Sequence, residues 1–154
     1  MKENLLSFFR KSALFCGLVL AATGCNLEED SVEIVTEHIF VNYRDWAWND
    51  FYARWECLVE WPYLTEDVYN EATVIGSVYV NETDANDRVY TTSKNLPFVH
   101  TFQDDNYRIF TETISFDVSP GTLCFYVQND DLDSRREPVQ DEYEFKVTAI
   151  WRRY

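Results

Sequence analysis

The chain has 154 residues and a formal net charge of −14 at neutral pH, with 27 acidic residues against 13 basic ones. A surface of this charge repels phosphate backbones, so nucleic acid is excluded as an expected partner. A hydrophobic content of 46% and an aromatic content of 17% exclude a disordered chain. The length fits one domain that can bury a core without disulfide staples.

The first 24 residues have the composition of a secretory signal. Lys2, Arg10 and Lys11 make the start positive, and the uncharged run Ser12–Ala22 follows. This run is shorter than the roughly 20 residues that cross a bilayer. A positive start, a short apolar stretch and small residues together predict a signal peptide over 1–24. A buried N-terminal helix is the alternative, but the run lacks helical periodicity.

The stretch Ala22-Thr23-Gly24-Cys25 resembles the lipobox of bacterial lipoproteins, with Ala22 where leucine is usual. The resemblance implies that Cys25 becomes the new N-terminus and carries acyl chains. Each buried CH₂ group of such chains contributes about 0.8 kcal/mol to membrane attachment. Cofactors are not expected, and the expected partner is a membrane, reached through the lipid on Cys25. The removed segment has a net charge of +2, so the mature chain would carry −16.

Three acids, Glu28, Glu29 and Asp30, follow the anchor closely. They resemble the acidic export signal of surface lipoproteins in the Bacteroidota, which implies an outer-membrane protein on the cell surface. The alternative is a solvated tether that faces the periplasm. Residues 25–31 are therefore expected to form a lipidated acidic tether.

Residues 32–154 are predicted to form an all-β domain, an antiparallel β-sandwich of about seven strands. Apolar and polar residues alternate in short segments separated by turn signals. One short helix is expected after Thr65, which can cap it, and Pro97 suggests an edge strand. The seven predicted strands are 36–43, 51–61, 72–80, 95–102, 107–118, 122–128 and 143–151.

Two cysteines, Cys57 and Cys124, remain in the predicted domain. An exported protein can form disulfides. However, alternation places Cys57 beside Trp55 on the core side, whereas Cys124 lies opposite Leu123 and Phe125. Because side chains on opposite faces diverge, a disulfide between the two is not expected.

No catalytic or metal motif is present in the sequence, so no enzyme activity and no bound metal are expected. His38 and His100 are the two histidines, each within a predicted strand. The acidic segments 104–106 and 129–134 are rich in oxygen ligands of the kind that calcium takes. They lack the spacing of a known calcium loop, and solvated loops are the favoured interpretation.

Two tryptophans, Trp46 and Trp48, lie among charged and polar residues in "RDWAWND". If exposed, they could stack on sugar rings while nearby polar groups bind the hydroxyls, which makes them candidate ligand-binding residues. The favoured alternative is that they fold back and cover one end of the sandwich, because large aromatic residues usually bury most of their area.

Several short motifs resemble a group of small uncharacterised Bacteroidota surface lipoproteins. They are "DWAWND", "CLVEWPYLTEDVYNEATVIGSVYV", "LPFV", "TISFDVSPGTLCFYVQNDD" and "EFKVTAI", and they cover most of residues 38–151. The chain departs from this group at Glu71, where a glycine is often found. The resemblance implies a β-sandwich on an anchor and implies no chemistry.

The sequence therefore predicts a non-enzymatic outer-membrane surface lipoprotein that acts as a binding or adhesion module, with glycans as the candidate ligands. The alternative is an accessory or structural subunit of an outer-membrane protein complex.

Overall fold

The fold was described from a computed structural model. The described residues are 31–103, 107–131, 138 and 142–153. The predicted signal peptide 1–24, the lipidation residue Cys25 and the acidic residues Glu28, Glu29 and Asp30 lie outside them.

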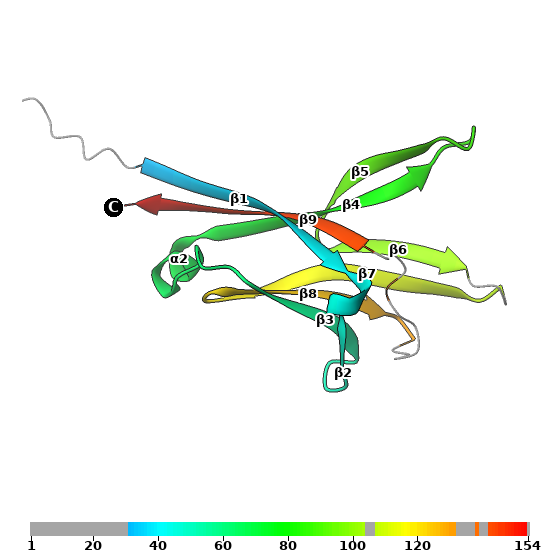
Figure 1. Ribbon diagram of the computed structural model, residues 1–154, viewed down its shortest axis with the longest axis horizontal. Helices are drawn as coiled ribbons and strands as arrows, with labels where there is room; N and C mark the ends of the chain where they lie inside the picture. The colour runs from blue at the N-terminus through cyan, green and yellow to red at the C-terminus, as the bar shows by residue number, and fades with distance from the viewer. Residues whose placement is uncertain (1–30, 104–106, 132–137, 139–141, 154) are drawn as a thin grey trace, which may run out of the picture. The chain divides into compact units, whose positions relative to one another are not determined.

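The described chain forms two antiparallel sheets, and the prediction of an all-β sandwich is confirmed (Figure 1). One sheet has four strands in the order β1-β9-β4-β5, and the other has five in the order β2-β3-β8-β7-β6. The elements are β1 (Ser31–Asn42), η1 (Tyr43–Asp45), β2 (Ala47–Asn49), β3 (Arg54–Glu60), α2 (Glu66–Glu71), β4 (Thr73–Thr83), β5 (Val89–Asn95), β6 (Phe98–Gln103), β7 (Ile109–Ser119), β8 (Thr122–Asn129) and β9 (Glu142–Arg153).

The described residues contain nine strands rather than about seven, because two strands lack the expected pattern. Strand β2 has only three residues and lies within "RDWAWND", a segment that is not among the seven predicted strands. Strand β5 lies at an edge of its sheet and is mostly exposed, so it needs no apolar face. The seven predicted strands are all present, and β6 lies at a sheet edge as Pro97 suggested.

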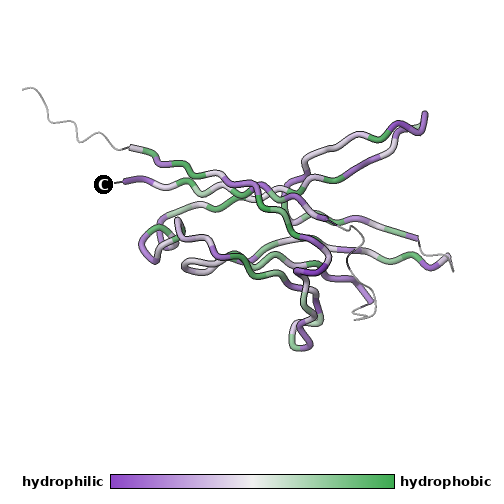
Figure 2. The backbone as a smooth tube through the Cα atoms, in the orientation of Figure 1, coloured by the Kyte–Doolittle hydropathy of each residue, from purple (hydrophilic) through white to green (hydrophobic). Residues whose placement is uncertain are grey.

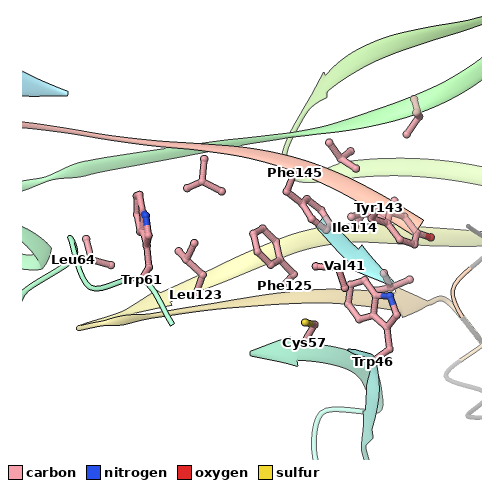
Figure 3. Packing of buried hydrophobic residues seen from close by; sticks show 14 of the residues in the cluster. Val41, Trp46, Cys57, Trp61, Leu64, Ile114, Leu123, Phe125, Tyr143 and Phe145 are labelled. Atoms are coloured by element: carbon pink, nitrogen blue, oxygen red, sulfur yellow. The ribbon is translucent and has the colours of Figure 1, made fainter. Parts of the chain in front are cut away.

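The core fills the space between the two sheets (Figure 3). More buried and more exposed side chains alternate along β1, because successive side chains point to opposite faces. Figure 2 shows that this strand carries both hydrophobic and hydrophilic residues. The largest fully buried side chain is Trp61. Phe125 of one sheet stacks on Phe145 of the other with ring centroids 4.0 Å apart, so this pair joins the two layers.

The short connections form where the sequence predicts them. The hydroxyl of Thr65 accepts a hydrogen bond from the Val68 N–H at 3.4 Å and caps α2. The turn between β7 and β8 contains Gly121 at φ 75°, a left-handed conformation that glycine adopts without steric cost.

The strands bring the two ends of the described domain together, because Ser31 in β1 is paired with Arg153 in β9. At the other end of β1, the chain crosses through η1 into β2 of the second sheet. The β2–β3 hairpin therefore follows the Asn42 end of β1 and projects sideways from the two sheets (Figure 1). We call the Asn42 end of β1 the distal end. In the described part of the chain, no helix is both long and apolar enough for a membrane span.

Candidate functional site

Trp46 is a core residue, which agrees with the favoured interpretation that its side chain is buried and corrects its candidacy as a ligand-binding residue. Only 7% of its surface is exposed, and its ring meets Tyr143 edge-on with centroids 5.6 Å apart (Figure 3). The turn before it is held by the Asn42 N–H, which donates to a carboxylate oxygen of Asp45 at 2.8 Å. This turn directs Trp46 inward although its neighbours in sequence are polar. Its ring has no open face for a sugar.

Trp48 is partly exposed in β2 and remains a candidate ligand-binding residue. Its indole N–H donates to Asp50 Oδ1 at 2.8 Å. Its ring packs edge-on against Trp55 with centroids 5.7 Å apart. The N–H edge of the Trp48 indole is therefore hydrogen-bonded within the hairpin itself.

The most exposed aromatic side chains of the β2–β3 hairpin lie in its loop. Phe51 is 86% exposed and Tyr52 is 54% exposed, and their rings meet edge-to-face at 4.8 Å. The sequence pattern assigned both to the start of a strand, so their place in a loop was missed. No signal in the pattern separates them from the strand, since 51–61 alternates throughout.

This loop is bound to its surroundings by several hydrogen bonds. Asn49 Oδ1 accepts from the backbone N–H groups of Phe51 at 3.0 Å and Tyr52 at 3.3 Å. The amide of Gln128, on β8, donates to the Tyr52 carbonyl at 3.0 Å. Ala53 adopts φ 50°, a conformation that non-glycine residues keep only where the surroundings impose it. The exposed rings are thus carried by a pre-organised loop.

Arg54 connects the loop to the outer face of the five-stranded sheet. Its guanidinium carbon lies 4.8 Å from the Tyr52 ring centroid and 3.9 Å from that of Tyr126. It also donates to Glu56 at 2.6 Å and Asp117 at 2.7 Å. Burial opposes the charge, but the hydrogen bonds and charges of the two carboxylates outweigh it and raise the pKa of Arg54. The cation is fixed between aromatic and acidic groups.

We call this set the aromatic hairpin site. Its residues are Trp48, Phe51, Tyr52, Arg54 and Tyr126. It combines exposed aromatic rings with a fixed cation and bordering carboxylates, and it belongs to the distal end of the fold. Such a surface can stack on a flat or cyclic ligand and form hydrogen bonds at its rim.

The two cysteines point to opposite faces of the five-stranded sheet, as alternation predicted. Cys57 is buried in the core, whereas Cys124 is paired with Leu58 on the outer face. Burial is the main cause that raises the pKa of each thiol to about 11. Thiols that stay protonated at neutral pH are poor nucleophiles.

The histidines and the buried acid form no catalytic set in the described part of the chain. His38 Nδ1 lies 2.7 Å from Glu144 Oε1, while His100 packs 4.2 Å from the Phe102 ring. Glu112 is 1% exposed and accepts a hydrogen bond from the Tyr143 hydroxyl at 3.0 Å. In these residues no histidine is hydrogen-bonded to a serine, threonine or cysteine.

The described ranges contain no group of three His, Cys, Asp or Glu residues placed to hold a metal ion. The acidic segment 104–106 and residues 132–134 of the second acidic segment lie outside these ranges.

In comparisons with known proteins, no family model, curated protein or solved structure matches the chain. The aromatic hairpin site therefore carries the functional assignment.

Proposed function

We propose that this protein is a non-enzymatic, lipid-anchored surface protein of the outer membrane that binds glycans through the aromatic hairpin site. The observation that carries the proposal is the exposure of Phe51 and Tyr52 on a loop fixed by hydrogen bonds. Large aromatic side chains are usually buried in a folded protein, and the exposed rings of Phe51 and Tyr52 forgo the free energy of that burial. A loop that holds them in place lowers the ordering cost of binding, which favours a binding role.

The chemistry around the rings supports a sugar ligand. Tyrosine and phenylalanine faces stack on the apolar C–H face of a sugar ring. Asp50 and Asp117 are exposed beside the rings and can accept hydrogen bonds from hydroxyls. The site thus offers both contacts that a sugar requires.

The place of the site in the fold supports an anchored binder. The segment with Cys25 enters the domain at Ser31, and the aromatic hairpin site lies at the distal end. Strand β1 has 12 residues, which at about 3.3 Å each span roughly 40 Å. An anchor before Ser31 would leave the hairpin free to meet a ligand.

The test is electrophoresis of the full chain, purified in non-ionic detergent, through gels that contain single polysaccharides. Retardation by at least one polysaccharide is expected, and Tyr52→Ala should abolish it. Tyr63→Ala is the matched control, because Tyr63 is 53% exposed and lies outside the site. If Tyr52→Ala is retarded as strongly as the native chain, or no polysaccharide retards it, the proposal is wrong.

An accessory subunit of an outer-membrane complex remains the second candidate, and one observation favours it. Val32, Ile34 and Ile75 are between 53% and 62% exposed on the outer face of the four-stranded sheet. Ile34 and Ile75 belong to adjacent rows of that face, near the Ser31 end. An apolar surface of this kind suits a protein partner near the membrane. This candidate would be favoured if the native chain bound no glycan but co-purified with protein partners, and if Ile34→Glu lost those partners.

A further inference from the structure

A pocket of about 500 Å³ is lined mainly by residues of the four-stranded sheet and shares no residue with the aromatic hairpin site. Two of its lining residues, Asn95 and Leu96, lie where β5 ends and the chain passes to β6 in the other sheet. Pockets of a few hundred Å³ are the usual size for small ligands.

The pocket exists because β4 continues past the end of β5. Pairing between these strands stops at Ser77 and Asn95, and beyond it the Leu96 N–H donates to the Gly76 carbonyl at 2.9 Å. Strand β4 therefore runs on to Thr73 without a strand neighbour on this side. The ring of Phe116, from the other sheet, lies against Gly76 on the core side of β4 and lines the space at the open edge of this strand.

Three neighbouring strands place polar side chains in one row of the pocket wall. Asn95 of β5 is paired with Ser77 of β4, which is paired with Lys146 of β9. Residues in register point to the same face of a sheet, so these groups face one space. Within the described residues, none of the three forms a side-chain hydrogen bond or an ion pair with another side chain. Their donors and acceptors remain open to a ligand.

The charge of Lys146 sets the class of ligand. Arg54, Lys94 and Arg153 each pair with a carboxylate, whereas Lys146 has no such partner among the described residues. An ammonium at the wall of a pocket attracts an anionic group. The chain's net charge of −14 repels anions at long range, so the affinity should be modest.

We infer that this pocket binds a single acidic sugar, one ring that bears a carboxylate. The carboxylate contacts Lys146 and the hydroxyls bond to Ser77 and Asn95 on the outer face of the sheet, while the apolar ring face meets Phe116 at the open edge of β4. This site is independent of the aromatic hairpin site, so either can fail without the other.

The experiment is saturation-transfer NMR of the full chain in detergent, with D-glucuronate, D-glucose and acetate as probes. Saturable binding of glucuronate is expected, with weaker or no binding of the other two. Lys146→Gln should lower the affinity about tenfold or more, since it removes a charge-assisted hydrogen bond. Lys94→Gln is the matched control and should bind as the native chain does.

Four outcomes with the native chain and Lys146→Gln would overturn the inference. They are no saturable binding of glucuronate, equal binding of acetate, equal binding of glucose, and unchanged binding by Lys146→Gln. Tyr52→Ala should leave the binding of glucuronate unchanged. A loss in that variant would place the ligand at the aromatic hairpin site and would also overturn the inference.

Discussion

Replacement of Gly76 by alanine should destabilise the fold, because the new methyl group would meet an aromatic ring. A Cβ atom at this position would lie 2.5 Å from Phe116 Cε1 and 3.1 Å from Leu96 Cδ1. The φ angle of Gly76 is not in the left-handed region, so the backbone itself accepts alanine. Overpacking of this kind costs about 1–3 kcal/mol. Reduced freedom of the unfolded chain returns about 0.4–1 kcal/mol. The net loss should lie between about 0 and about 2.6 kcal/mol.

The assay is urea unfolding of the full chain, followed by the fluorescence of its five tryptophans. A double-mutant cycle with Phe116→Ala isolates the contact. Without the ring, Gly76→Ala should be neutral or stabilising, so the coupling should be at least about 1 kcal/mol, within the usual range for residues in contact. The packing argument would be refuted if Gly76→Ala had the same effect in the native chain and in Phe116→Ala. It would also be refuted if Gly76→Ala stabilised the native chain.

Two further predictions concern the core and the thiols. Trp46→Ala should lower the unfolding free energy by about 3–5 kcal/mol. Trp48→Ala should lower it by less than half of that, because the Trp48 ring is partly exposed. If urea unfolding gives similar losses for the two variants, the placement of Trp46 in the core is contradicted. Because Cys57 and Cys124 have pKa values near 11 against an ordinary 9, the folded state binds more protons between these pH values. The unfolding free energy should therefore fall as pH rises from about 9 to about 11, by up to about 1.4 kcal/mol per pH unit for each thiol. The double alanine variant should lose that part of the slope, and an unchanged slope would count against the raised values.

Much of the fold follows from alternation along the chain. In β7, Glu112 lies on the same side as Phe110 and Ile114 and is buried there, although its charge breaks the apolar pattern of that face. The two cysteines were separated by the same rule. Both placements share a cause, since the position of a side chain in a strand depends only on odd or even numbering.

The aromatic and pocket sites could not be found in this way. Burial of Trp46 depends on a turn, not on its polar neighbours in sequence. Phe51 and Tyr52 alternate like strand residues, yet the strand begins only at Arg54. Contacts between distant strands decide such positions, and a single sequence does not display them.

The row of the pocket wall depends on strand order in the same way. Ser77 has Asn95 on one side and Lys146 on the other only because β4 lies between β5 and β9. The chain order of these strands gives no sign of that arrangement.

The pairing of β1 with β9 sets the order in which this fold can be completed. Their partners are between 122 and 100 positions apart, from Ser31 with Arg153 to Asn42 with Glu142. Strand β9 also pairs with β4, so it is an interior strand of the four-stranded sheet. The sheet cannot close while β9 is still being synthesised, and β1 must wait as an unpaired, partly apolar strand. Domains dominated by such distant contacts fold slowly, in milliseconds to seconds. A chain that is slow to close stays extended for longer, which would suit the export across a membrane that the proposed function implies.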